Sequence, residues 1–446
     1  MYISKSIYLV AGLQKSGFSA TKLLLQKKAK VYIYDKRLND KITENKNQLV
    51  ELGAIYVEDY KTIANEIDVL VISPGVPIDS DICKFYKSLN IRIIGELELS
   101  SLLTATPIIA VSGTNGKTTV CSLLHNALIQ NECKSLLAGN VGTPLSEVID
   151  KANESDVLVL EVSSYQLEST YSFCPHVSII LNITPDHLER HYSMENYTLV
   201  KSKLVLPLRE SEYAVLNYDD EIVRNFSSLT RAKIIWFSKN EKVNGSYLKD
   251  GALYFNEEKI VEVSSLSLKE PHNLQNVLAT ICALKAIKLT NLQIKNSICN
   301  FKGVKHRFEN VATVSGVQFI NDSKSTNQDS TIKAIESLKK KTVLILGGSD
   351  KGLDYTKLFE KINKSNKIIK TVITGACANV MLSYAIKSNV DNIVMVKSFD
   401  DAVITAYRLC KEGEAVLLSP GTASFDEFSS FEKRGERFCE IVKSLK

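Results

Sequence analysis

The stretch 113–119, Gly-Thr-Asn-Gly-Lys-Thr-Thr, has the residue types and spacing of a phosphate-binding loop. It lies between an apolar run at 107–112, which we expect to be a strand, and a helix expected over about 117–130. Backbone N–H groups at a helix N-terminus can surround phosphate oxygens, Lys117 can reach the terminal phosphates, and the Thr118 hydroxyl can bind Mg²⁺. The candidate phosphate ligands in this loop are Gly113, Thr114, Asn115, Gly116, Lys117, Thr118 and Thr119.

The loop departs from the strict P-loop pattern at one position, because Val111 stands where that pattern has its first glycine. An ordinary turn from a strand into a helix is the alternative interpretation. Such a turn would rarely need two glycines followed by lysine and two threonines, so phosphate binding is favoured.

Three groups of short apolar runs, glycine-containing turns and helical stretches position this loop, and they indicate parallel α/β units. The first group has expected strands at 7–11, 30–35 and 68–73, with a helix at 19–28. The second has strands at 107–112, 156–162, 177–183 and 213–217, short strands between 237 and 262, and a helix near 273–287. The third has strands at 317–321, 342–347, 369–374, 393–396 and 415–419. We expect an α/β protein of three domains with largely parallel sheets, namely a Rossmann-like domain at 1–98, a P-loop-type central domain at 99–302 and a Rossmann-like domain at 303–446.

The bulk composition is that of an ordinary globular protein, with 44% hydrophobic and 24% charged residues in 446. A net charge of +5 is too small to predict a nucleic-acid-binding surface. The nine cysteines form no C-x-x-C pair and no metal-type spacing, which favours reduced thiols in the cytoplasm. No segment resembles a signal peptide or a membrane span, so we expect no membrane partner.

Several longer motifs resemble the Mur ligases, the enzymes that build the peptidoglycan stem peptide. The loop at 113–119 resembles the ATP loop of that family, and the segments 160–168 (LEVSSYQLE) and 181–191 (LNITPDHLERH) resemble its two central metal-site segments. The segments 320–327 (INDSKSTN) and 419–426 (SPGTASFD) resemble those of the D-glutamate-adding members. The resemblance covers the whole chain.

The resemblance implies a metal site beside the phosphate loop. Glu161 ends an expected strand, where a carboxylate can hold Mg²⁺ together with Thr118, and His187 matches the ligand of a second metal ion. Lys201 follows Tyr197 at the spacing of a lysine that the family carbamylates with CO₂, a change that turns a cation into a metal-binding anion. Lys203 is close enough in sequence to leave that choice open. The implied catalytic residues are Lys117, His187 and Lys201, and the implied metal ligands are Thr118, Glu161, His187 and Lys201.

The first domain begins with a strand and the turn 12–17, which imitates a dinucleotide fold. Gln14 replaces the glycine that would let the backbone approach a pyrophosphate, so a redox cofactor is disfavoured. In the resembling family this site holds the UDP of the substrate. The implied UDP-substrate residues are Lys15, Ser16, Asp35, Lys36, Ser73 and Gly75, together with Asn140 and Gln166 from the central domain.

Further residues are assigned by resemblance to ATP and to the incoming amino acid. Asn273 and Asn276 match positions that line the base pocket, Arg307 follows His306 in a family His-Arg pair, and Asp322 and Lys324 match positions near the ribose and phosphates. For a dicarboxylate such as D-glutamate, Lys351 offers a cation in the glycine-rich turn 347–352. The remaining implied contacts of D-glutamate are Thr326, Ser424, Phe425 and Phe431.

Taken together, the resemblance implies an ATP-dependent amide ligase that adds D-glutamate to UDP-N-acetylmuramoyl-L-alanine through an acyl phosphate. It implies a role in peptidoglycan synthesis and so in cell-wall growth, cell shape and division. We expect a monomer that takes small-molecule substrates. One alternative is another amide ligase of the same fold, such as folylpolyglutamate synthase, and another is a nucleotide-binding scaffold without catalysis.

Overall fold

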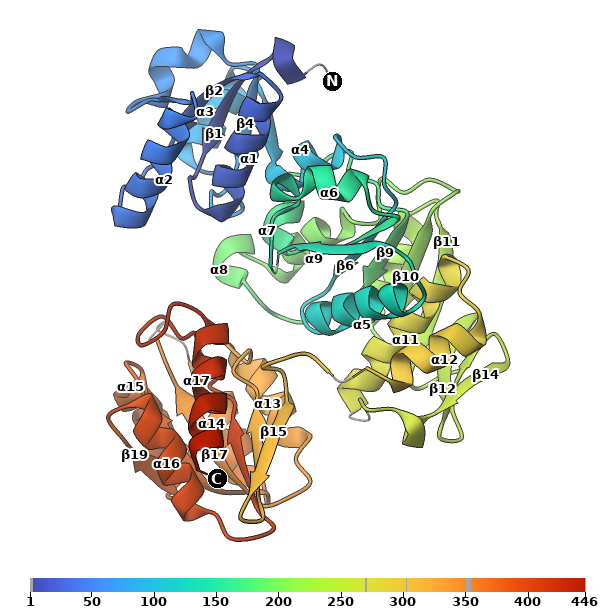
Figure 1. Cartoon of the computed structure of the whole chain (residues 1–446), viewed down its shortest axis with the longest axis vertical. Helices are drawn as coiled ribbons and strands as arrows, with labels where there is room; N and C mark the ends of the chain where they lie inside the picture. The colour runs from blue at the N-terminus through green and yellow to red at the C-terminus, as the bar shows by residue number, and fades with distance from the viewer. Residues whose placement is uncertain (1–2, 141, 269–270, 302, 350–353, 446) are drawn as a thin grey trace. The chain divides into compact units, whose positions relative to one another are not determined.

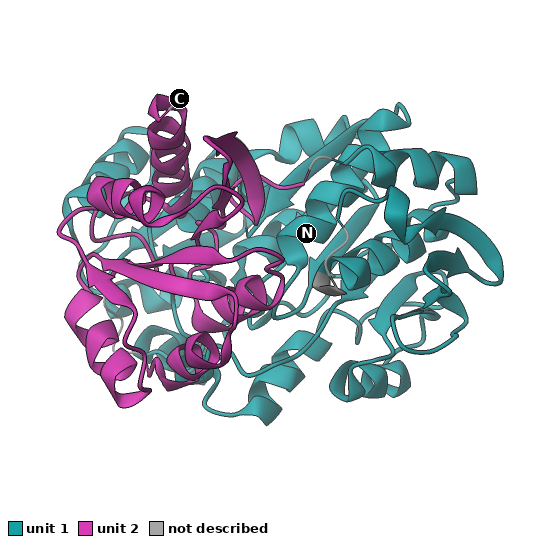
Figure 2. Cartoon of the chain, turned by 90° about the horizontal axis from the view of Figure 1, so that it is seen from below, with its two compact units in different colours: residues 1–269, 273–301 teal, residues 270–272, 302–446 magenta. Residues whose placement is uncertain are grey.

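The computed structural model describes residues 3–140, 142–268, 271–301, 303–349 and 354–445, and it contains three sheets. The chain divides into two compact units, one of residues 1–269 and 273–301 and the other of residues 270–272 and 302–446 (Figures 1 and 2). Two sheets belong to the first unit and one to the second. The expected three-domain α/β fold with mostly parallel sheets is confirmed, while the boundaries at 98 and 302 stay predictions.

The N-terminal sheet has five parallel strands in the order β3-β2-β1-β4-β5. Apolar side chains point to both faces of β1, so Tyr8 and Val10 pack in one buried cluster and Leu9 and Ala11 in another. This explains why the run reads as continuously apolar rather than alternating. The strands are β1 (Ile7–Ala11), β2 (Lys30–Tyr34), β3 (Ile55–Tyr56), β4 (Val69–Ile72) and β5 (Arg92–Gly95), and the helices are α1 (Lys15–Gln26), α2 (Asp40–Glu51), α3 (Asp81–Ser88) and α4 (Glu96–Ser101).

The central sheet has nine strands in the order β14-β13-β12-β11-β10-β9-β6-β8-β7. The two pairings at the β14 edge of this sheet, β12 with β13 and β13 with β14, are antiparallel, as expected for a β excursion at 237–262. The strands are β6 (Ile108–Ser112), β7 (Ser135–Gly139), β8 (Val157–Glu161), β9 (Val177–Ile180), β10 (Tyr213–Asn217), β11 (Lys233–Ser238), β12 (Gly245–Lys249), β13 (Ala252–Phe255) and β14 (Glu258–Glu262). The helices are α5 (Lys117–Gln130), α6 (Ile149–Asn153), α7 (Ser164–Leu167), α8 (Leu188–His191), α9 (Met194–Ser202), α10 (Glu221–Asn225), α11 (Pro271–Ala286) and α12 (Asn291–Cys299).

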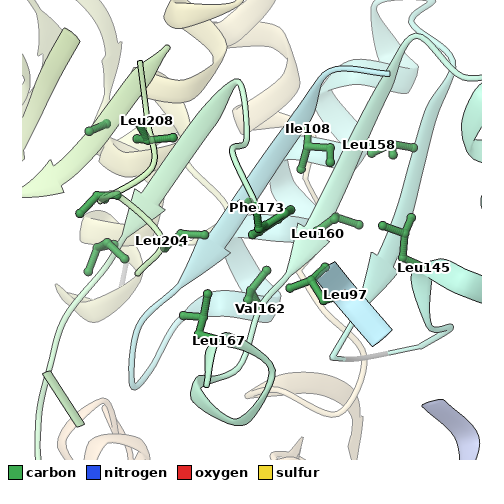
Figure 3. Packing of buried hydrophobic residues seen from close by; sticks show 14 of the residues in the cluster. Leu97, Ile108, Leu145, Leu158, Leu160, Val162, Leu167, Phe173, Leu204 and Leu208 are labelled. Carbon is green, nitrogen blue, oxygen red and sulfur yellow. The ribbon is translucent and has the colours of Figure 1, made fainter. Parts of the chain in front are cut away.

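One buried cluster fills the space under this sheet and reaches the strands that carry the phosphate loop (Figure 3). Leu158 and Leu160 of β8 pack there with Ile108 of β6, and Phe173 closes the cluster beside them. Fully burying a side chain of this size contributes about 1.5 to 3 kcal/mol. The cluster therefore fixes β6 and β8, and with them the two ends at which Ser112 and Glu161 lie.

In the described part of the second unit, six strands form a sheet in the order β15-β16-β20-β17-β18-β19, and only the pairing of β15 with β16 is antiparallel there. Leu344 and Leu346 of β17 face one buried cluster, whereas Val343 and Ile345 face another, so helices cover both sides of the sheet. The strands are β15 (Glu309–Val314), β16 (Val317–Asn321), β17 (Thr342–Gly347), β18 (Ile368–Thr374), β19 (Ile393–Met395) and β20 (Ala415–Leu418). The helices are α13 (Gln328–Glu336), α14 (Thr356–Lys364), α15 (Ala378–Lys387), α16 (Phe399–Leu409) and α17 (Phe431–Ser444).

Some elements have other bounds than the sequence predicted, and some strands were not predicted at all. The helix predicted at 19–28 is α1, Lys15–Gln26, and it begins four residues earlier because the turn after β1 is only three residues long. The strand predicted at 177–183 ends at Ile180, since Asn182 and Thr184 instead bond to the phosphate loop. Strands β3, β5, β7, β11 and β15 were not predicted. The residues of β15 are mixed in polarity and mostly only half-buried, so they show no apolar run.

Glu98 of α4 stabilises the first unit, because its buried carboxylate accepts the backbone N–H groups of Tyr171, Ser172 and Phe173 at 3.0 to 3.2 Å. Replacement by alanine would leave three donors without this acceptor. We expect Glu98→Ala to lower the free energy of unfolding by roughly 3 kcal/mol, seen as a lower melting temperature in calorimetry. Glu51→Ala, at an exposed position of α2, is the matched control. Equal melting temperatures for the two variants would contradict this role.

Among the described residues, no helix is both long and apolar enough to cross a membrane.

Candidate active site

The phosphate loop lies between β6 and α5, as predicted, and its backbone has the shape that glycine permits. Gly113 and Gly116 have φ angles of 148° and 90°, in the region that residues with a Cβ rarely adopt. At Gly116 an added Cβ would also overlap the side-chain oxygen of Asn276. Both glycines are therefore required by the local geometry, and α5 begins directly behind them at Lys117.

Side chains fold back on this loop and hold it. Lys117 Nζ donates to the carbonyl oxygens of Gly113 at 2.9 Å and Thr114 at 3.0 Å, which keeps the ammonium group over the loop. The side chain of Asn182 accepts from the Asn115 N–H at 2.8 Å and donates to the Asn115 carbonyl at 3.1 Å. The loop is therefore held in place by contacts from its own chain, with its anion-binding end at the head of a 14-residue helix.

A short network of hydrogen bonds connects the phosphate loop to the end of β8. Thr118 Oγ1 donates to Glu161 Oε2 at 2.6 Å, and Asn140 Nδ2 donates to Glu161 Oε1 at 3.0 Å. Both Thr118 and Glu161 are buried. A hydroxyl and a carboxylate at the mouth of a phosphate loop suit Mg²⁺, which binds few protein ligands and keeps several waters. The pair Thr118 and Glu161 therefore fits the metal that the sequence predicted.

Lys201 lies under the same loop. Its Nζ donates to the Gly113 carbonyl at 3.0 Å and to Ser112 Oγ at 3.3 Å, and the side chain is only 1% exposed. Burial, followed by the charge of Lys117, holds the pKa of Lys201 well below its usual value. The neutral amine, which a lowered pKa favours, is the form of lysine that reacts with CO₂. Lys203 points elsewhere, because its Nζ donates to the Glu168 carbonyl at 2.6 Å.

His187 lies on a different segment of the central domain. It has a left-handed backbone with φ of 53°, precedes α8, and its Nδ1 lies 3.0 Å from the Tyr165 hydroxyl. Within the described residues, no three His, Cys, Asp or Glu side chains gather as a metal cluster. A carbamate on Lys201 would add an acidic group that the unmodified chain lacks. The assignment of His187 to a second metal stays a prediction.

Helix α11 brings its two predicted asparagines to the loop. Asn276 Nδ2 donates to Asn273 Oδ1 at 3.3 Å, and the Asn276 side chain contacts Gly116. Both amides are buried at the loop, where polar groups can contact a bound nucleotide. The structure thus places seven loop residues and two helix residues of the predicted ATP site together.

A cavity of about 830 Å³ lies between the N-terminal and central parts of the first unit. Asp35 shapes its floor, because its carboxylate accepts the N–H groups of Leu13 at 2.7 Å and Arg37 at 3.0 Å. Lys15 Nζ donates to the carbonyl of Gly142 across the cavity. All eight predicted UDP-substrate residues line it, namely Lys15, Ser16, Asp35, Lys36, Ser73, Gly75, Asn140 and Gln166. Asn140 belongs both to this lining and to the Glu161 network.

In the second unit, buried polar contacts organise the predicted residues. Asp322 accepts from Ser325 Oγ at 2.5 Å and Ser419 Oγ at 2.8 Å, and burial raises its pKa to about 6. Lys324 Nζ lies 5.2 Å from the centre of the Phe431 ring. Ser424 is buried, Phe425 is 73% exposed, and Arg307 and Thr326 are half-buried. Lys351 lies outside the described residues.

Sequence reasoning missed several residues that this geometry uses. Asn182 holds the loop, and Asp186 acts electrostatically on Lys201. Arg434, nearly fully buried, donates to the backbone carbonyls of Ser323, Gly347 and Thr422 and so connects the end of β17 to two loops of the second unit. No local sequence pattern marks Arg434. Asn182 and Asp186, in contrast, lie in the segment 181–191, whose resemblance to a metal-site segment is a signal that could have found them.

The chain matches three family descriptions in succession. Residues 6–95 match the Mur ligase MurD-like N-terminal domain, residues 111–284 the Mur ligase middle domain and residues 306–421 the Mur ligase glutamate ligase domain. The UDP-N-acetylmuramoylalanine–D-glutamate ligase of Thermoanaerobacter sp. (strain X514) is 40% identical over 98% of both chains. The enzyme of that name from Bacillus subtilis (strain 168) is 35% identical over 100% of this chain and 99% of its own.

Solved structures share the fold at low sequence identity. The UDP-N-acetylmuramate-alanine ligase of Thermotoga maritima is 18% identical, with a TM-score of 0.61 over 99% of this chain and 100% of its own. The MurF ligase of the same organism, solved in complex with ADP, is 17% identical, with a TM-score of 0.60 over 99% and 96%.

The fold and the phosphate loop define an α/β enzyme of the ATP-dependent, amide-forming ligase class. The chain belongs to the Mur ligase family.

Proposed function

We propose that this ligase joins D-glutamate to UDP-N-acetylmuramoyl-L-alanine in peptidoglycan precursor synthesis, in the cytoplasm and as a monomer. Relatives named UDP-N-acetylmuramoylalanine–D-glutamate ligase match 98% to 100% of this chain. The observation that carries the proposal is the network of Asn140, Glu161 and Thr118, because it joins the wall of the large cavity directly to the phosphate loop. A carboxylate at the end of a bound UDP-substrate would thereby meet the γ-phosphate of ATP.

In the proposed reaction, a carboxylate oxygen of the alanyl group attacks the γ-phosphorus of ATP, and ADP leaves. The amine of D-glutamate then attacks the acyl carbon, and inorganic phosphate leaves as the amide bond forms. The triphosphate, the substrate carboxylate and the charge of the transition state are all negative. The site must therefore offset the repulsion among them. Lys117, held over the loop by two carbonyl oxygens, supplies a cation where that charge accumulates.

Mg²⁺ would be held by Thr118 and Glu161, and when bound it would supply further positive charge to the phosphates. Lys201 as a carbamate would place an anion under the loop, where an ammonium group would repel the metal. His187 would add a further ligand or orient the substrate. Burial and hydrogen-bond partners support the roles of Thr118, Glu161 and Lys201. The role of His187 rests on the family resemblance.

The second unit would supply the remaining contacts. Asp322, Lys324 and Arg307 would reach the nucleotide, and Arg307 suits a bidentate phosphate contact. Lys351, Thr326 and Ser424 would hold the two carboxylates of D-glutamate, with Phe425 and Phe431 against its apolar carbons.

A panel of acceptors tests the proposal. Purified enzyme with ATP and Mg²⁺ is given UDP-N-acetylmuramoyl-L-alanine with D-glutamate, with L-glutamate or with L-alanine, and in parallel a folate with L-glutamate. We expect ADP and the new amide only from the first pair. Turnover with the folate pair alone would assign the chain to folylpolyglutamate-type chemistry, and no turnover with any pair would favour a scaffold.

A further inference from the structure

A buried salt bridge in the first unit lies beside the large cavity and has no part in the mechanism above. Arg190 Nε donates to the two carboxylate oxygens of Glu168 at 3.0 and 3.1 Å, and its Nη2 donates to Glu168 Oε2 at 2.6 Å. The two side chains are only 14% and 6% exposed. Such a pair is held in one geometry, because separating it would leave a buried charge without its partner.

The same guanidinium group also reaches the N-terminal part of the unit. Arg190 Nη2 donates to the carbonyl oxygens of Val76 at 3.1 Å and Pro74 at 3.4 Å. Pro74 and Val76 both line the cavity, in the loop that follows β4. A planar guanidinium can bond a carboxylate and two carbonyls at once, whereas a lysine ammonium cannot reproduce that fork.

The guanidinium of Arg190 also lies beside a tyrosine that contacts His187. This guanidinium lies 5.2 Å from the centre of the Tyr165 ring, and the Tyr165 hydroxyl lies 3.0 Å from His187 Nδ1. Gln166, the neighbour of Tyr165, lines the cavity. The Arg190 side chain therefore connects the segment of His187 to two walls of the cavity, the Pro74–Val76 loop and the helix α7 that carries Gln166.

We propose that Arg190 is a positioning residue for the UDP-substrate. Paired with Glu168, it holds the Pro74–Val76 wall against the central part of the unit and so sets the width of the cavity. This inference rests on the proposed function, because it takes the cavity as the UDP-substrate site. Without the fork of hydrogen bonds the wall is free to move, so binding of the UDP-substrate weakens while binding of ATP does not.

Steady-state kinetics of Arg190→Lys test the proposal. Lysine keeps the charge beside Glu168 but loses the carbonyl contacts, so we expect the KM for UDP-N-acetylmuramoyl-L-alanine to rise roughly 10-fold. The KM for ATP and kcat should stay within about twofold of the parent. Tyr192→Phe is the matched control, because its hydroxyl bonds to Asp79 Oδ2 at 2.6 Å across the same two parts. Tyr192 is 70% exposed and Asp79 does not line the cavity, so this variant should behave as the parent.

A merely structural role would lower the melting temperature and the amount of active enzyme without a selective change in one KM. The double variant Glu168→Gln with Arg190→Gln removes both charges, and it replaces Arg190→Lys if that variant does not fold. An unchanged KM for the UDP-substrate in the folded variant overturns the proposal, and so does an equal rise in the KM for ATP.

Calorimetric titration with UDP separates this inference from the proposed function. If the parent enzyme forms no amide with D-glutamate, the proposed function fails, but UDP binding still tests Arg190. A roughly 10-fold weaker affinity for UDP in Arg190→Lys than in Tyr192→Phe would support the positioning role. Equal affinities would overturn it.

Discussion

Lys117→Ala is expected to lower kcat on the order of 10³-fold, because the loop would lose the ammonium group that the Gly113 and Thr114 carbonyls hold over it. Positive charge aimed at the transferring phosphate acts most strongly in the transition state, when repulsion among the anions is greatest. The rate of ADP release with saturating ATP, UDP-substrate and D-glutamate measures the effect.

The backbone of the loop should survive this change, since Gly113 and Gly116 set its shape and Asn182 holds Asn115. We therefore expect a melting temperature close to that of the parent. Lys242→Ala removes an exposed lysine of the same unit, paired with Glu257, and serves as the control. Turnover of Lys117→Ala within about twofold of the control would contradict the mechanism itself.

Lys201→Met is expected to lower ligation by at least 10²-fold, to order of magnitude, and to raise the melting temperature of the ligand-free, CO₂-depleted protein. The activity falls because no carbamate can form under the loop. The stability rises because burial disfavours the protonated lysine that the unfolded chain carries at neutral pH, and methionine fills the same buried space without an ionisable group. Enzyme assays and calorimetry on the same samples measure the two effects. Lower activity together with a higher melting temperature would indicate a functional residue that destabilises the fold.

The pH dependence of this stability difference has a definite sign. Burial, and then Lys117, lower the pKa of Lys201 in the folded state, so the unfolded chain binds more protons between that lowered pKa and the ordinary value of 10.5. Stability of the unmodified parent therefore rises with pH across this window. The difference in free energy of unfolding between Lys201→Met and the parent should therefore narrow as the pH approaches the ordinary pKa of lysine.

The nearby Lys203 offers a matched control, because it is also partly buried but donates to the Glu168 carbonyl rather than to the loop. Lys203→Met should keep its response to CO₂, so that stripped enzyme regains activity with added bicarbonate, as the parent does. Lys201→Met should not respond. A bicarbonate response in Lys201→Met, or its absence in the parent, would remove carbamylation from the account.

The sequence by itself determined the phosphate loop and many of the helices and strands around it. Helix α5 has the bounds that the pattern predicted, and β1, β10, β16 and β17 do as well. These features are local, because apolar runs report burial on both faces of a sheet and the glycines report backbone angles that other residues rarely adopt. The family resemblance then assigned residues that composition and spacing cannot assign, such as the eight that the structure places around one cavity.

Only the tertiary structure decided which side chains meet. Asn140 and Glu161 are 21 residues apart, and Arg190 and Pro74 are 116 apart, yet each pair forms hydrogen bonds. The structure also distinguished Lys201 from Lys203, two residues apart, by turning one under the phosphate loop and the other toward Glu168. Such contacts depend on how strands and helices pack rather than on local pattern, because a side chain's charge and partners are set by what the fold brings beside it.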